Sequence, residues 1–161
     1  MPIPTDTQKI ATVADLIQSD RWEVAELRAA STVVGMIRYR TPVLSGKSVS
    51  GYTRVLKVVW PYAEEGSQGL PSAEQSLRMT VFEDRFVEAV EHDARAVLVA
   101  VLTFDGVRQW VFYTNDIADC GARLGAMPQE AEPYPLELTS DEDPAWQYLH
   151  DEILAQVPHT P

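Results

Sequence analysis

The chain has 161 residues, of which 45% are hydrophobic and 23% are charged, and its formal net charge is −11. This composition is typical of one globular domain and excludes a disordered chain. The sequence holds no apolar run of the roughly 20 residues that a membrane-spanning helix needs. Its single cysteine, Cys120, excludes an internal disulfide. The first residues lack a basic stretch followed by an apolar one, so we expect a cytoplasmic protein.

The charges are distributed unevenly along the chain. Residues 27–63 contain six bases and no acid, whereas residues 124–161 contain eight acids and neither lysine nor arginine. Either the two sections neutralise each other in the fold, or the acidic section faces a basic partner. A chain of this net charge repels phosphate at long range, so nucleic acid is an unfavourable partner.

The N-terminal part predicts a short helix and two strands. Residues 1–11 show no periodic pattern and are expected to be loose. Residues 12–19 have the apolar spacing of an amphipathic helix, and residues 22–30 and 32–40 have the β-branched and aromatic content of strands. Residues 41–51, which are rich in glycine and serine, predict a loop.

The central unit begins with a strand at residues 52–62, in which alternate apolar side chains share one face. A loop and the main helix follow. Ser72 and Gln75 fit a capping box, in which the serine oxygen accepts a backbone N–H and the glutamine side chain reaches back. An apolar stripe with three- and four-residue spacing then predicts the buried side of that helix. Its members are Met79, Phe82, Phe86, Ala89 and Val90.

The second half of the central unit begins with a hairpin. Asp105-Gly106 separates two apolar runs, residues 95–104 and 107–114, and this dipeptide is a strong signal for a tight turn between strands. A second helix is expected to begin after a cap at Thr114 or Asn115. Its inward side chains would be Ile117, Cys120 and Leu124. Residues 133–138 predict the last strand of the unit.

The resulting order, βαββαβ, is that of the ferredoxin-like unit. We therefore expect an α+β fold: an antiparallel ferredoxin-like sheet, extended by the N-terminal strands, with helices mostly on one face. An extra C-terminal helix is expected at residues 143–156, because Asp143 suits an N-cap and Pro144 the first helical position. The whole of residues 1–161 is treated as a single domain whose βαββαβ core spans residues 52–139.

Five residues form the best candidate for a ligand-binding or partner-binding site. Arg38 and Arg40 lie on one face of a predicted strand, where their guanidinium groups could bind an anion or an acidic partner. Arg108 lies beside the large aromatic residues Trp110 and Tyr113, where it would either line a pocket or stack as a cation–π pair. The alternatives are that the arginines pair with acids of the same chain and that the aromatic residues pack in the core.

No motif indicates catalytic residues, a metal site or a cofactor. The histidines lack a carboxylate or cysteine at ligand spacing, and Cys120 is expected to be a buried thiol without a nearby base. The acidic residues 141–143 do not follow a calcium-loop pattern and are expected to lie in a solvated loop. We therefore lean against an enzyme and expect no cofactor and no metal.

Two segments carry the most specific patterns of the chain: the hairpin strand Gly106-Val107-Arg108-Gln109-Trp110-Val111-Phe112-Tyr113, and the ending Asp143-Pro144-Ala145-Trp146-Gln147-Tyr148. Together with Gly51-Tyr52, Trp60-Pro61-Tyr62, Gly69-Leu70-Pro71 and Phe82-Glu83-Asp84, they resemble the bacterial family called domain of unknown function 695. The resemblance spans residues 22–153. It implies no reaction, because the family is uncharacterised. Some members are fused to a domain similar to regulator B of ribonuclease E, a small acidic inhibitor, and we identify no such second domain in this sequence.

The expected function is therefore that of a non-enzymatic acidic protein that binds or regulates a basic protein partner, such as an RNA-processing enzyme. One alternative is a small-ligand binder or enzyme with its site near Arg38, Arg40, Arg108, Trp110 and Tyr113. A second alternative is a single-stranded RNA binder that stacks bases on strand aromatics. The sequence does not indicate the oligomeric state.

Overall fold

The computed structural model describes residues 12–41, 48–63, 70–128 and 133–157. Within these residues the strands are β1 (Trp22–Ala29), β2 (Thr32–Arg40), β3 (Arg54–Pro61), β4 (Ala96–Phe104), β5 (Val107–Thr114) and β6 (Glu137–Glu142). The helices are α1 (Val13–Ser19), α2 (Ala73–Glu91) and α3 (Ile117–Ala126), followed by the π-helical turn η2 (Tyr148–Ile153) and the 3-10 turn η3 (Leu154–Gln156). The predictions for residues 1–11 and for residues 42–47 of the predicted loop fall outside the described residues.

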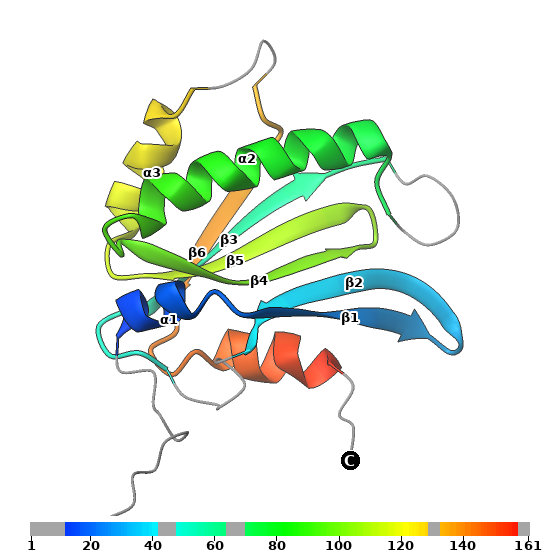
Figure 1. The fold of residues 1–161 in the computed structure, drawn as a ribbon, viewed down its shortest axis with the longest axis horizontal. Helices are drawn as coiled ribbons and strands as arrows, with labels where there is room; N and C mark the ends of the chain where they lie inside the picture. The colour runs from blue at the N-terminus through cyan, green and yellow to red at the C-terminus, as the bar shows by residue number, and fades with distance from the viewer. Residues whose placement is uncertain (1–11, 42–47, 64–69, 129–132, 158–161) are drawn as a thin grey trace, which may run out of the picture.

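All strands belong to one antiparallel sheet in the spatial order β1-β2-β4-β5-β3-β6 (Figure 1). The predicted α+β class is confirmed. The N-terminal strands extend the sheet beside β4, as expected. None of the helices in the described part of the chain is long and apolar enough to cross a membrane.

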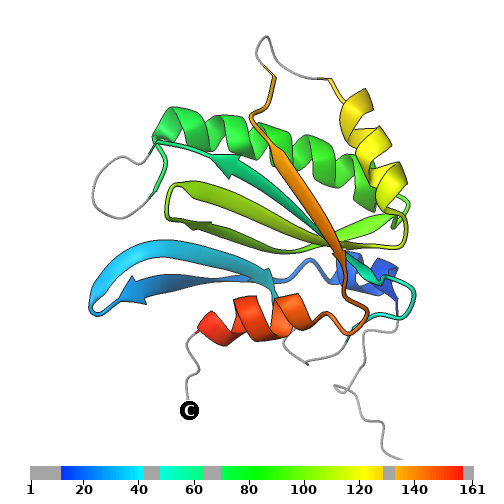
Figure 2. The same cartoon turned by 180° about the vertical axis from the view of Figure 1, so that it is seen from behind.

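Helical segments cover both faces of the sheet (Figure 1 and, from behind, Figure 2). We call the side under α2 and α3 the α2 face, and the side under α1 and the turns η2 and η3 the α1 face. The two longest helices, α2 and α3, share one face, as predicted, but the cover on the other face was not predicted. The reason for this cover lies in β4, which is buried at every position from Ala96 to Thr103 and so needs cover on both sides.

Each face has its own core. On the α2 face the core is rich in aromatic rings, and Trp60, Phe82, Phe86, Trp110 and Phe112 are among its buried members. On the α1 face aliphatic side chains surround the rings of Tyr39, Tyr113 and Trp146, and the other buried members include Val55, Val97, Val111 and Leu149. Successive residues of a strand point to opposite faces, so residue parity decides which core a β5 side chain joins.

The local signals of the central unit are largely confirmed. Asp105 and Gly106 both have positive φ, 56° and 78°, as the predicted tight turn between β4 and β5 requires. The Ser72 hydroxyl caps α2 by accepting from the Gln75 N–H at 3.1 Å. The Gln75 side chain differs from the prediction: its amide oxygen accepts from the Trp60 indole N–H at 3.3 Å, which joins α2 to β3.

Three predicted boundaries were wrong. Asp116, rather than Thr114 or Asn115, caps α3, because Thr114 still pairs in β5. The last strand is Glu137–Glu142, rather than residues 133–138, because its acidic C-terminal residues pair with β3. These residues can be acidic because β6 is an exposed edge strand. The C-terminal helical segment begins at Tyr148 and not at Asp143, since Trp146 has φ 58°, which interrupts a helix.

Candidate functional site

Arg40 lies at the end of β2 on the α2 face, and its side chain is only 3% exposed. Its Nε donates to the Leu98 carbonyl oxygen at 2.7 Å, and its Nη1 donates to the Leu16 carbonyl oxygen at 3.2 Å. Its Nη2 donates to both carboxylate oxygens of Glu91, at 3.2 and 3.1 Å. Arg40 therefore ties α1, β4 and α2 together, and every nitrogen of its guanidinium group has a partner inside the fold.

Glu91 completes this buried pair. Its Oε2 also accepts from the Leu98 backbone N–H at 2.8 Å. Burial raises the pKa of Glu91 above its ordinary value, although the hydrogen bond from Leu98 and the charge of Arg40 act in the opposite direction. The pair is thus a structural connection and offers no free donor.

Arg38 lies two residues before Arg40 and faces the same side of the sheet. Its Nη2 donates to Glu83 Oε1 at 2.6 Å, and the side chain is 34% exposed. The same glutamate oxygen accepts from the indole N–H of the buried Trp110 at 2.9 Å. The Trp22 ring lies against both arginines, with its centroid 5.1 Å from the Arg38 Cζ and 4.6 Å from the Arg40 Cζ.

Arg108 joins Arg38 and Glu83 on the α2 face. Its Nε donates to the Thr103 hydroxyl at 2.9 Å, and its two terminal nitrogens have no hydrogen-bond acceptor among the described residues. Burial lowers the pKa of Arg108, the negative charge of Glu83 raises it, and the positive charge of Arg38 lowers it again. We call Arg38, Glu83 and Arg108 the arginine cluster. It carries two positive charges and one negative charge.

Tyr113 lies on the α1 face, so the sheet separates it from the arginine cluster. Its hydroxyl donates to Asp143 Oδ2 at 2.6 Å and accepts from the Leu149 backbone N–H at 3.3 Å. Burial and the adjacent Asp143 carboxylate raise the pKa of Tyr113. Its ring stacks on Trp146 with centroids 4.2 Å apart, and the Trp146 indole N–H donates to the Tyr52 carbonyl oxygen at 2.8 Å. Tyr113 therefore anchors the C-terminal segment to the sheet.

A hollow of about 300 Å³ opens where β3 and β6 meet η2. Lys57 is its one basic residue, and the Lys57 ammonium nitrogen lies 3.8 Å from the centroid of the Tyr148 ring. We call this the acidic hollow, because carboxylates dominate its lining. The buried Asp143 accepts from the Gln147 and Tyr148 backbone N–H groups. The exposed carboxylates belong to Asp141, Glu142, Asp151 and Glu152.

The basic and acidic sections of the sequence do meet in part. β3 pairs with β6, and an Arg54 nitrogen lies 3.9 Å from a carboxylate oxygen of Glu142. Most other early bases pair elsewhere: Arg28 with Glu26, and both arginines of β2 with α2. Among the described residues, mutual neutralisation of the two sections, the first alternative from the sequence, is thus limited to the contact between Arg54 and Glu142. The excess of acid that remains around Lys57 is concentrated in the acidic hollow.

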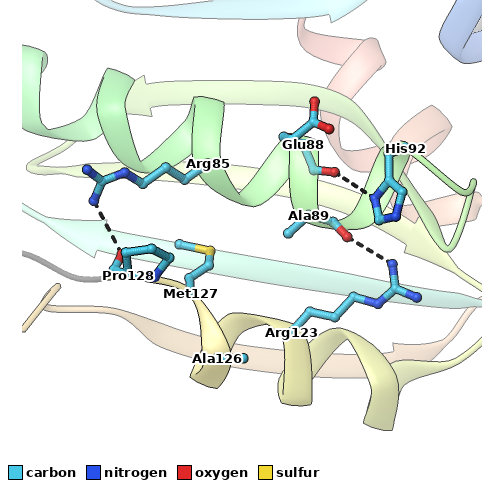
Figure 3. A pocket seen from close by; sticks show the side chains of 8 residues that line it. All are labelled: Arg85, Glu88, Ala89, His92, Arg123, Ala126, Met127 and Pro128. Atoms are coloured by element: carbon cyan, nitrogen blue, oxygen red, sulfur yellow. Dashed lines mark hydrogen bonds between the residues drawn. The ribbon is translucent and has the colours of Figure 1, made fainter.

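A second, larger hollow of about 480 Å³ lies between α2 and α3 (Figure 3). The two arginines of its lining contact main-chain oxygens: Arg85 donates to the Pro128 carbonyl at 3.2 Å, and Arg123 donates to the Ala89 carbonyl at 2.8 Å. Ala126 and Met127 contribute apolar surface. The sequence did not suggest this hollow, because it depends on how α3 packs on α2.

Cys120 is buried in α3, as predicted, with its sulfur 3.3 Å from the Thr114 hydroxyl oxygen. Burial raises the pKa of the Cys120 thiol, which disfavours the reactive thiolate. Within the described residues, no group of three or more histidine, cysteine, aspartate or glutamate side chains is arranged to hold a metal ion.

Comparison with known families gives one match. A model described as a family of unknown function, DUF695, matches residues 20–154. Neither the curated proteins nor the solved structures give a match. The matched range includes both segments on which the resemblance rested, and in the structure these segments touch through Tyr113 and Asp143.

Proposed function

The chain belongs to the DUF695 family of unknown function, and we propose that it acts without catalysing a reaction, by binding a basic segment of a cytoplasmic partner protein in the acidic hollow. The observation that carries this proposal is the excess of carboxylates there. Four exposed carboxylates surround a hollow with a single lysine. Carboxylates are the natural partners of arginine and lysine side chains, and the net charge of −11 would steer a basic partner toward the chain.

The Tyr148 ring adds a second feature suited to cations. The ammonium group of Lys57 already lies against its face at 3.8 Å, so the ring favours positive charge at that place. The Gln109 amide donates to the Tyr148 hydroxyl at 2.5 Å and holds the ring in position. A lysine or arginine of the partner would find carboxylates already placed, beside a ring that holds the Lys57 ammonium group away from them.

The edge strand β6 supports an extended form for the partner segment. β6 is the last strand of the sheet, and Glu137, Thr139 and Asp141 are exposed along it. The free edge of a strand can pair with an added strand from another protein. A basic extended segment that pairs with β6 would place its side chains beside the carboxylates. RNA-processing enzymes are one class of partner with such segments, since surfaces that bind phosphate are basic.

The finer architecture belongs to the same proposal. We propose that β3, β4, β5 and β6 with α2 and α3 form a ferredoxin-like unit. The order β4-β5-β3-β6 supports this, because one strand separates each pair of strands that a helix connects. Such a unit assigns no function by itself. A role in binding single-stranded RNA has less support, since the strand aromatics Trp110 and Phe112 are buried under α2.

A basic model peptide tests the proposed function. A fluorescent decalysine peptide is titrated with the full chain at low and high salt, and binding is followed by fluorescence anisotropy. The variant Asp141→Asn, Glu142→Gln, Asp151→Asn, Glu152→Gln should bind at least about tenfold more weakly than the unaltered chain at low salt. Four lost charges at one site each weaken the attraction of a peptide cation.

A matched control removes the same number of exposed acids elsewhere: Asp15→Asn, Glu74→Gln, Asp84→Asn, Asp105→Asn. This variant has the same net charge as the first, and its peptide affinity should fall by less than about threefold. Equal weakening in both variants would show that net charge, and not the acidic hollow, binds the peptide. Absence of binding by the unaltered chain at low salt would also contradict the proposal.

A further inference from the structure

We propose that Arg38 and Arg108 of the arginine cluster bind the anionic group, a carboxylate or a phosphate, of a small molecule on the α2 face of the sheet. This site lies on the opposite face from the acidic hollow and binds ligands of opposite charge. It therefore goes beyond the function proposed above, and either proposal can fail without the other.

Unused hydrogen-bond donors are the first observation. Arg108 uses Nε for Thr103, and its two terminal nitrogens have no acceptor among the described residues. Arg38 uses one terminal nitrogen for Glu83. Arg40, on the same face, has all its nitrogens bonded within the fold. The guanidinium group presents parallel donors that match the two oxygens of a carboxylate or phosphate. Of these three arginines, Arg108 thus has the most nitrogens without an acceptor among the described residues.

Local charge is the second observation. Within the described part of the chain, Glu83 is the carboxylate whose charge acts on Arg108, whereas Arg38 and Arg108 are both cationic, so these three side chains together keep one positive charge in excess. Burial already disfavours the charged form of Arg108. A partly buried charge without its own counter-ion is unfavourable, and an anion that binds there removes that cost.

The neighbouring surface indicates what the rest of the ligand contacts. β1 and β2 extend the sheet beyond β4 (Figure 1). Val24 pairs with Arg38 in the strand register and is 57% exposed, and Met36 pairs with Thr103. These apolar side chains lie next to the positions that hold the two arginines. The ligand class is therefore a small molecule with an anionic group and an apolar body.

The negative charge of Glu83 allows a test of the proposal, because its removal should change the affinity for an anion. Its Oε1 accepts from both Arg38 and Trp110, so it competes for the donors that an external anion would use. Glu83→Gln keeps an oxygen that can accept from Trp110 but removes the negative charge. If the cluster is an anion site, this substitution should increase the affinity for an external anion.

The experiment is an NMR titration of the full ¹⁵N-labelled chain with inorganic phosphate and, separately, with benzoate. The reporters are the Trp110 indole N–H and the Arg108 Nε–H, which lie at the cluster. The unaltered chain should show saturable shifts with at least one probe, and the stronger probe identifies phosphate or carboxylate as the preferred group. Arg108→Gln should weaken that binding at least about tenfold, and Glu83→Gln should strengthen it about tenfold. Each factor of ten corresponds to about 1.4 kcal/mol.

Arg54→Gln is the matched control, since Arg54 is partly exposed, pairs with Glu142 and lies six residues along β3 from Trp60, the β3 residue that pairs with Arg108. Its affinity for the stronger probe should stay within about twofold of the unaltered chain. Absence of saturable shifts with both probes would overturn the proposal, as would equal affinity in Arg108→Gln. If Arg108→Gln does not fold, Glu83→Gln decides: an unchanged or weaker affinity overturns the site.

Discussion

Arg40 and Arg38 lie two residues apart on β2, face the same side of the sheet and each meet a glutamate of α2, yet they sit in different surroundings. The Arg40 and Glu91 side chains are 3% and 9% exposed, whereas those of Arg38 and Glu83 are 34% and 16% exposed. Carbonyl oxygens of α1 and β4 complete the bonding of Arg40. Arg40 is therefore buried and fully bonded within the fold, whereas Arg38 is more exposed and has fewer acceptors.

A third pair extends this comparison to a more exposed carboxylate, although its arginine, at 21% exposed, is less exposed than Arg38. Arg123 of α3 donates two parallel hydrogen bonds to Asp93, at 2.7 and 2.8 Å, and the Asp93 side chain is 41% exposed. The geometry of this pair is better than that of Arg38 with Glu83, but water competes for both of its members. Across the three pairs we expect the effect on stability to follow burial rather than bond length.

The largest effect is expected for Arg40→Met. The substitution leaves the Glu91 carboxylate buried without its counter-ion and leaves the Leu16 carbonyl oxygen without the bond from Arg40. Removing one partner of a buried pair typically lowers the free energy of unfolding by about 3–5 kcal/mol. Urea unfolding followed by circular dichroism measures this change.

The double substitution Arg40→Met, Glu91→Leu is the control for that measurement. It removes both charges, so no unpaired carboxylate remains, and it should recover at least about half of the lost stability. A loss of less than about 1 kcal/mol in Arg40→Met alone would contradict the structural role of the buried pair.

A smaller effect is expected for Arg38→Met. Glu83 keeps its hydrogen bond from Trp110, and the partial exposure of both side chains gives water access to the carboxylate. The free energy of unfolding should fall by about 1 kcal/mol, the usual net value of one hydrogen bond. Urea unfolding measured beside Arg40→Met tests the difference. If both variants lose the same stability, burial does not distinguish the two arginines.

The smallest effect is expected at the exposed pair and depends on pH. The hydrogen bonds from Arg123 hold the pKa of Asp93 well below its ordinary value of 3.8. A carboxylate whose pKa is lower in the folded chain stabilises it above 3.8, and this contribution is lost as the pH falls through the lowered pKa. Asp93→Asn should therefore lower the melting temperature at neutral pH, and the difference should shrink toward acid pH. A difference that is independent of pH would show that the Asp93 charge does not contribute.

The sequence predicted the central unit best where local residues determine the structure. The Asp105-Gly106 turn and the Ser72 cap depend on a few neighbouring residues, and the stripe of α2 depends on helical spacing alone. The edge strand β6 was placed too early, because its acidic half resembles a solvated loop until β3 pairs with it. The residues of β6 themselves carry no sequence signal that β3 will pair with them.

The candidate site was predictable only in part, for a similar reason. Residue parity already places Arg108 and Trp110 on one face and Tyr113 on the other, so Tyr113 could have been separated from the arginines by alternation. The pairing of Arg38 with Glu83 spans 45 residues and depends on where α2 crosses the sheet. The acidic hollow likewise forms only when the C-terminal segment folds back beside β3 and β6.

The hydrogen bond from Trp146 to Tyr52 connects residues that are 94 positions apart. Contacts of such separation raise the contact order of a chain, and a high contact order slows folding. During synthesis on the ribosome, Val111 and Tyr113 emerge before the C-terminal segment that covers them. Their apolar face of the sheet is therefore exposed to solvent until the turns η2 and η3 have been synthesised. The nascent chain therefore passes through a stage at which chaperones have a hydrophobic surface to bind.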